Sequence, residues 1–264
     1  MGIGERAHRR RRVSRPIAGT ALLGALVAAL VVVALLLGSG LFGQGLPNAL
    51  REWGGPLPRV SPCTVETAHG EVGLDRAQAQ RATTAVALHA RGQGAPDTSD
   101  IDGAALQRLA EGAPGDAGAS LACRGTPADE LAEQQPAASG LTPRAERLLD
   151  EMTAVFGEQR LGGFAPGGVD HGHMPGSTHY EGRAIDIFFR PVTEEHRRQG
   201  WLLAHWLVAH ADELEVQYVI FDDRVWSVHR PDGQWRQYRA PDPGNEILRH
   251  LDHVHVDVLR GGTG

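Results

Sequence analysis

Hydrophobic residues first gather near the N-terminus of this chain of 264 residues. Residues 17–37 form an apolar run, and six of the first 15 residues are Arg. About 20 apolar residues span the hydrocarbon core of a bilayer, and a basic flank stays in the cytoplasm. We therefore predict a cytoplasmic basic tail over residues 1–16, a single transmembrane helix over 17–38 and an extracytoplasmic remainder. A cleaved signal peptide is the alternative, although the run is long for one.

Beyond the apolar run, the polar pattern favours short helices. Asp75 and Asp102 each precede an Ala-rich segment as a helix N-cap would, and Gly112 follows the second segment as a terminator. Large apolar residues are scarce here, so the core should be small. We predict a small helical segment over residues 63–123, set between a Gly- and Pro-rich linker over 39–62 and a second linker over 124–140.

The main hydrophobic core is expected in a domain over residues 141–260. A helix should begin at Thr142, with Pro143 in its first turn and Gly157 at its end. A strand (RAIDIFF), a second helix (TEEHRRQGWLLAHWLVAHADEL), a hairpin turning at Asp222 and Asp223, and a last strand (HVHVDVL) follow. Strands joined by tight turns favour a small antiparallel sheet with packed helices, an α+β fold.

Charge argues against one class of partner. All 26 basic residues are Arg, and the net charge is −6. The first 15 residues carry six Arg and one Glu, or +5, so the remainder carries −6 − 5 = −11. A nucleic-acid-binding surface needs a basic face. We therefore expect no nucleic-acid partner.

The predicted extracytoplasmic location determines how the two cysteines are interpreted. Cys63 and Cys123 both lie beyond the apolar run. Outside the cytoplasm a cysteine pair is more often bonded than free. We predict a disulfide between them, with two buried free thiols as the alternative.

The last strand carries the first candidate chemistry. Because side chains alternate along a strand, the valines of HVHVDV share one face, while His253, His255 and Asp257 share the other. Imidazole nitrogens and carboxylate oxygens are ligands of zinc. This strand can supply one or two ligands of a metal site.

The stretch STHYEGRAID can supply the rest. Asp186 lies between Ile185 and Ile187, where a carboxylate is costly to bury unless it is paired or bound to a metal. A turn at Gly182 can bring His179 back beside it. We predict a zinc site formed by His179, Asp186 and His255, with water as the fourth ligand.

Three further residues are candidates for catalysis. His253 lies on the same strand face as His255 and can act as a general base. Asp252 competes for that role if the strand begins only at His253. Arg183 can hold a substrate carboxylate or a developing oxyanion, or can be a surface strand residue. The nearby His171 and His173 can bind a second metal or line the cleft.

The motif S-T-H-Y-E-G-R-A-I-D resembles the S-x-H-x-x-G-x-A-x-D signature of the zinc D-alanyl-D-alanine carboxypeptidases and related peptidoglycan endopeptidases. H-V-H resembles the closing motif of the same superfamily, which includes the hedgehog signalling domain. The resemblance covers about half of the chain and implies that His179, Asp186 and His255 bind zinc. One departure is that the carboxypeptidases place Glu where this chain has Asp252.

These patterns lead to a functional expectation. We expect a membrane-anchored, extracytoplasmic zinc metallopeptidase that hydrolyses amide bonds in the stem peptides of peptidoglycan, as a carboxypeptidase or an endopeptidase. The alternative is a catalytically inactive binding or structural module of the cell envelope that keeps the fold, with or without the metal, and binds wall peptides or a partner.

Overall fold

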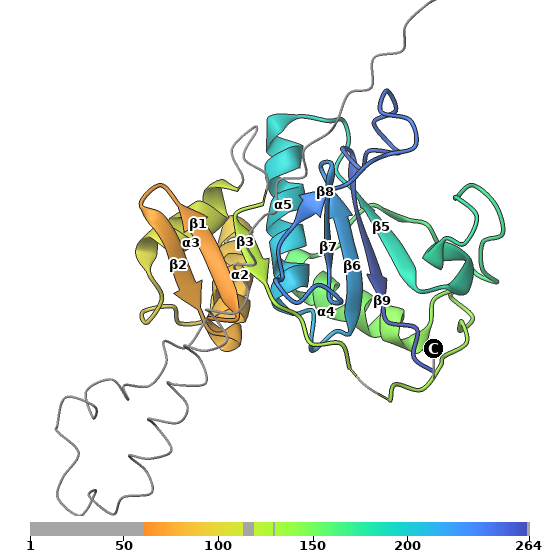
Figure 1. Cartoon of the computed structure of the whole chain (residues 1–264), viewed down its shortest axis with the longest axis horizontal. Helices are drawn as coiled ribbons and strands as arrows, with labels where there is room; N and C mark the ends of the chain where they lie inside the picture. Colours follow the sequence, from red (N-terminus) through yellow and green to blue (C-terminus); the bar gives the residue numbers. More distant parts are fainter. Residues whose placement is uncertain (1–60, 113–118, 129, 263–264) are drawn as a thin grey trace, which may run out of the picture. The chain divides into compact units, whose positions relative to one another are not determined.

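A computed structural model describes residues 61–112, 119–128 and 130–262 (Figure 1). The predicted basic tail and transmembrane helix, and almost all of the first linker, lie outside these residues. Among the helices that are described, none has the length and apolar character needed to cross a membrane. The described residues all belong to one compact unit.

The centre of this unit is a six-stranded antiparallel sheet. Its strands, in spatial order, are β4 (Leu161–Gly162), β5 (Ala184–Phe188), β9 (His253–Val258), β6 (Val216–Phe221), β7 (Arg224–Ser227) and β8 (Arg236–Gln237). The last strand of the chain, β9, is inserted between β5 and β6, which lie far from it in the sequence. The predicted antiparallel α+β architecture is confirmed.

Two helices pack against this sheet. Helix α4 (Pro143–Phe156) is capped by Thr142, whose side chain accepts a hydrogen bond from Ala145 N, and it ends at Gly157 with φ 73°. Helix α5 (Glu194–Ala209) begins at its N-cap Thr193. Both helices contact β9, and α5 also contacts β6. The caps predicted for α4 are therefore the ones observed.

The predicted hairpin is also present. Strands β6 and β7 pair across Asp222 and Asp223, and both residues have positive φ, 51° and 58°. Asp tolerates this left-handed region better than most residues, and two positive φ values suit a two-residue hairpin turn.

The segment predicted to be helical is only partly so. It holds α2 (Arg76–Ala90) and α3 (Gly103–Glu111), but also a second sheet ordered β2 (Gly70–Leu74), β1 (Cys63–Thr67), β3 (Leu121–Cys123). This corrects the helical assignment. The strands are short and β2 contains two glycines, so their alternation is weak, and β1 pairs with β3 across a long sequence separation.

The disulfide between Cys63 and Cys123 is present, with an S–S distance of 2.10 Å. The two residues are direct partners in the pairing of β1 with β3. Nearby, the indole N–H groups of Trp226 and Trp235 donate to the carbonyls of Cys123 and Leu121. Of the three aromatic residues that follow β6, these two therefore pack into the core.

Candidate metal centre

The centre begins with the pairing of β5 and β9. Asp186 and His255 are direct partners across these antiparallel strands, and Phe188 is the partner of His253. Partners in a strand pair project to the same face of the sheet. The valines of β9 project to the opposite face and join the hydrophobic core, so the predicted division of β9 into two faces is confirmed.

A short turn delivers the third residue. The 3₁₀ helix η3 (Thr178–Glu181) is capped by Ser177, whose Oγ accepts a hydrogen bond from His179 N at 3.4 Å. Gly182 ends η3 with φ 66°, a left-handed conformation that glycine adopts without strain. The chain then enters β5, so the turn at Gly182 places His179 beside Asp186, as predicted.

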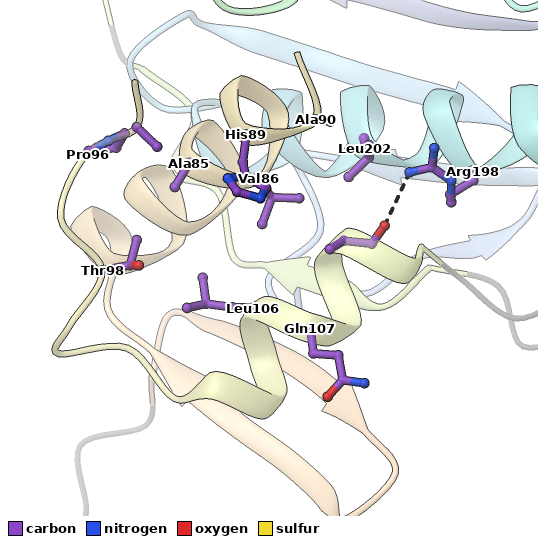
Figure 2. A pocket seen from close by; sticks show the side chains of 12 residues that line it. Ala85, Val86, His89, Ala90, Pro96, Thr98, Leu106, Gln107, Arg198 and Leu202 are labelled. Atoms are coloured by element: carbon purple, nitrogen blue, oxygen red, sulfur yellow. Dashed lines mark hydrogen bonds between the residues drawn. The ribbon is translucent and has the colours of Figure 1, made fainter. Parts of the chain in front are cut away.

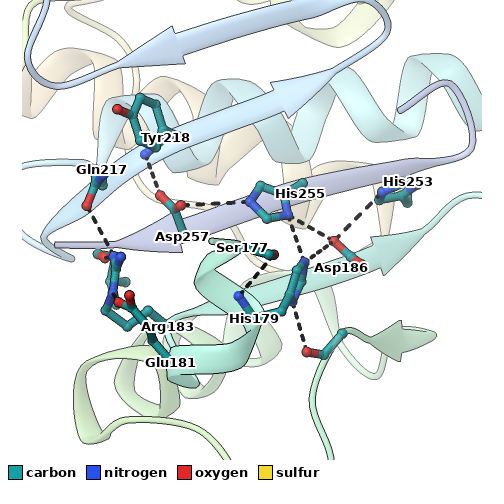
Figure 3. Close-up of polar contacts among 12 residues, drawn as sticks. Ser177, His179, Glu181, Arg183, Asp186, Gln217, Tyr218, His253, His255 and Asp257 are labelled. Carbon is teal, nitrogen blue, oxygen red and sulfur yellow. Dashed lines mark hydrogen bonds and ion pairs between the residues drawn. The ribbon is translucent and has the colours of Figure 1, made fainter. Parts of the chain in front are cut away.

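Three ligand atoms converge at this point (Figure 3). His179 Nε2 lies 3.1 Å from His255 Nδ1 and 3.3 Å from Asp186 Oδ1, and the latter two atoms are 3.1 Å apart. A tetrahedral zinc ion with bonds of about 2.0–2.1 Å separates its ligands by about 3.3 Å. The donor set and its spacing therefore form a group that could hold one metal ion.

Neighbouring groups orient both imidazoles. His179 Nδ1 donates to the carbonyl of Gly163 at 2.9 Å, which leaves the lone pair of Nε2 directed at the cluster. His255 Nε2 lies 3.8 Å from Asp257 Oδ2, and Asp257 also accepts a hydrogen bond from Tyr218 N. Such partners fix the ring orientation of metal-binding histidines. Asp257 lies two residues from His255 on the same face of β9, as the sequence predicts, whereas the contact of His179 with Gly163 depends on tertiary packing and is not apparent from the sequence.

His173 adds a fourth ligand-capable group. Its ring stacks on that of His179 with the centroids 4.0 Å apart. One ligand atom from each of His173, His179 and Asp186 lies within 4.8 Å of the others, so these residues also form a group that could hold a metal ion. In contrast, the side chain of His171 is 93% exposed and pairs with Asp170.

The charges of the cluster are coupled. Burial raises the pKa of Asp186, but its interactions with His179 and His255 outweigh this effect and hold the pKa below its usual range. Burial lowers the pKa of His255, yet the carboxylates of Asp186 and Asp257 raise it to about 9. In the metal-free protein, a proton on His255 therefore supplies the positive charge that a metal ion would otherwise bring to these carboxylates.

The two candidate bases turn out to be partners. Strand β9 begins at His253, and Asp252 lies just before it. His253 Nδ1 donates to Asp252 Oδ1 at 2.7 Å, while His253 Nε2 lies 3.7 Å from Asp186 Oδ1. His253 therefore directs its Nε2 toward the cluster, and the hydrogen bond from Nδ1 to Asp252 fixes the orientation of its ring.

Arg183 is not brought to the cluster. It is 7% exposed, and its guanidinium donates to Glu181, Gln217 and the carbonyl of Val258. Alternation along β5 explains this position, because odd-numbered residues project away from the face that carries Asp186. The geometry does not support the expected contact between Arg183 and substrate.

A cleft of about 620 Å³ opens over the cluster. His179, Asp186, His253 and His255 line it. His173 lines it as well, which is one of the two alternatives expected for this residue. Arg190, Tyr238 and His250 are among the further lining residues.

His250 and Tyr238 form one wall of this cleft. The ring centroid of His250 lies 4.7 Å from that of His253 and 4.9 Å from that of Tyr238. Burial lowers the pKa of His250 to about 3, so this imidazole is neutral near pH 7. Of the three aromatic residues that follow β6, Tyr238 alone lines the cleft.

A second hollow lies between α2, α3 and α5 and has a volume of about 420 Å³ (Figure 2). Its lining is mainly apolar, with Val86, Leu106 and Leu202 among its residues. His89 and Arg198 are its only ionisable lining residues. This hollow offers no set of metal ligands or nucleophile–base pair, in contrast to the cleft over the cluster.

Comparison with known proteins gives one partial match. The family model described as "VldE, C-terminal domain" matches residues 137–250, less than half of the chain. No curated protein and no solved structure matches the chain. The matched range includes His179 and Asp186 but ends before His253 and His255, and the family's description names neither a metal nor a peptidase.

Proposed function

We propose that this chain is a zinc-dependent peptidase of the cell envelope that hydrolyses amide bonds in peptidoglycan stem peptides. The observation that carries the proposal is the convergence of His179, Asp186 and His255, at zinc-like spacing, in a cleft that also holds His253. The envelope location rests on the basic tail and apolar run of the N-terminus. The substrate class rests on the resemblance of STHYEGRAID and HVH to the carboxypeptidase motifs.

The chemistry divides between the ion and the chain. A zinc ion bound to these ligands would lower the pKa of a bound water to about 7 and polarise a carbonyl. Amide hydrolysis takes one proton from the attacking water and gives one proton to the departing nitrogen as the C–N bond breaks. Because His253 Nδ1 donates to Asp252, its Nε2 is free to accept the first proton and return it to the amine.

The test uses the full-length chain purified in detergent and loaded with zinc. Purified muropeptides are incubated with it, and the products are identified by mass spectrometry with and without a chelator. We expect cleavage that stops on chelation, stops in His255→Ala and persists in His229→Ala, which removes an exposed histidine outside the cleft. Zinc binding without cleavage would favour the non-enzymatic envelope module.

A further inference from the structure

The cleft contains one permanent positive charge. Among the residues that line it, Arg190 is the only Arg, and Asp186 is the only acidic residue. Asp186 is already engaged by His179 and His255. An anionic group that enters this cleft therefore has Arg190 as its natural partner, apart from the metal centre itself.

Arg190 is held in position by two contacts. Its Cζ lies 4.0 Å from the centroid of the Phe188 ring, a cation–π arrangement. Its Nε donates to Asp252 Oδ2. The guanidinium has two further nitrogens, and the side chain remains 41% exposed at the cleft. A planar fork fixed by its Nε can present these nitrogens to a carboxylate.

The same contacts connect Arg190 to the reacting centre. Asp252 receives Arg190 on one oxygen and His253 on the other, and His253 Nε2 lies 3.7 Å from Asp186. Burial raises the pKa of Asp252, but the hydrogen bonds from His253 and Arg190 outweigh it, so this carboxylate stays ionised. Two hydrogen bonds, from Arg190 to Asp252 and from His253 to Asp252, therefore connect an anion bound at Arg190 with His253, the residue that faces the cluster.

We infer that Arg190 binds the terminal carboxylate of the substrate, so that the cleft selects peptides that end one residue beyond the scissile bond. This inference rests on the proposed peptidase function and specifies it as carboxypeptidase action. In an endopeptidase substrate, the same position would hold a neutral amide. Arg190 is then a residue that determines specificity, and Asp252 couples its occupancy to the base.

The test compares acetyl-D-Ala-D-Ala with its C-terminal carboxamide as substrates of the zinc-loaded, full-length chain. We expect kcat/KM to be about 10-fold to 100-fold higher for the free acid, the range for a hydrogen bond to a charged group. Arg190→Gln should remove this preference, because KM for the acid rises and cleavage of the acid falls much more than cleavage of the amide. Arg190→Lys should keep part of the preference.

The matched control is Arg239→Gln, which removes an exposed Arg that does not line the cleft and should retain the preference. Equal cleavage of acid and amide by the wild type would overturn the inference. An equal loss on both substrates in Arg190→Gln would also overturn it, because that result assigns Arg190 only to the support of Asp252.

Failure of the peptidase proposal gives a different result. If the wild type cleaves neither peptide, titration calorimetry of both peptides against the zinc-loaded wild type and Arg190→Gln decides the inference. Tighter binding of the acid that is lost in the variant would retain Arg190 as a carboxylate site in a binding module. Equal affinity for acid and amide would overturn it.

Discussion

Asp186 and His255 are direct partners across β5 and β9, and this pairing brings Asp186 Oδ1 to 3.1 Å from His255 Nδ1. The chain separates the two residues by nearly 70 positions, so the sheet register alone brings these two ligands together. A slip of one residue would turn one of them to the hydrophobic face. The proposed metal centre thus depends on the register of the central strands of the sheet.

Gly163 supplies the most specific structural prediction. A Cβ at this position would lie 2.2 Å from His179 Cε1 and 2.4 Å from Nδ1, and φ is +80°. Gly163→Ala should therefore displace His179 and lower zinc affinity by at least about 10-fold, the lower end for the loss of a supporting partner. Competition with a chromogenic chelator measures this affinity.

Gly167→Ala is the matched control for that experiment. Gly167 has nearly the same φ, +83°, but nothing lies within 4 Å of an added Cβ. Both variants carry backbone strain, and only Gly163→Ala also clashes with a ligand. Equal zinc affinity in the two variants would contradict the role assigned to Gly163.

Asp252→Asn tests the role of the general base without changing any proposed metal ligand. The substitution removes the carboxylate that fixes the proton on His253 Nδ1, while all three ligands remain. We expect kcat to fall by roughly 10²–10⁴, as for other bases that lose their orienting carboxylate, with zinc content unchanged. Steady-state kinetics and metal analysis on the same preparation check both parts; loss of zinc would show instead that Asp252 supports the metal site.

The stability of the metal-free protein should depend on pH through His255. Its folded pKa of about 9 is above the ordinary value near 6.5, so its stabilising contribution is complete below pH 6.5 and is lost as the pH rises through 9. The expected loss is on the order of 3 kcal/mol. Asp186, with a lowered pKa, stabilises the fold above its ordinary pKa and loses this contribution as the pH falls.

Chemical denaturation of the chelated protein between pH 6 and 9.5 measures this effect. His255→Gln should remove most of the slope above pH 6.5. Zinc should reverse the trend, because the ion competes with the proton for Nδ1 and binds more tightly as the pH rises. A slope that is the same in the variant would contradict the assignment to His255.

The disulfide contributes stability to the first sheet. It closes a loop with a sequence separation of 60, for which the chain-entropy model gives about 4 kcal/mol. Cys63→Ser with Cys123→Ser should lower the free energy of unfolding by about 2–4 kcal/mol. Zinc content should be unchanged, because the proposed metal centre lies on the other sheet. An unchanged unfolding midpoint would contradict this contribution.

The local elements of the fold could be predicted from the sequence. Helix caps at Asp75, Asp102 and Thr142 follow from side chains that accept hydrogen bonds from the backbone of their own helices. The turn at Asp222 and Asp223 follows from the tolerance of Asp for positive φ. Strands β1, β2 and β3 could not be predicted, because short strands stabilised by distant pairing leave little periodicity in the sequence.

The site residues also divide into those that local sequence patterns indicate and those that depend on distant contacts. His179, Asp186 and His255 could be selected because two short motifs place them near turns or on one strand face. Gly163, Arg190 and His250 were not selected, since each reaches the site through tertiary packing. Arg183 was misplaced for a local reason: it follows η3 but projects to the side opposite Asp186.

The most direct test of the central claim is the zinc content of the full-length chain after exposure to zinc and removal of excess metal, measured by mass spectrometry of the elements. We predict about one zinc ion per chain in the wild type and in His229→Ala, and close to none in His179→Ala, Asp186→Ala or His255→Ala. Zinc that is absent from the folded wild type, or retained by all three ligand variants, would contradict the metal centre.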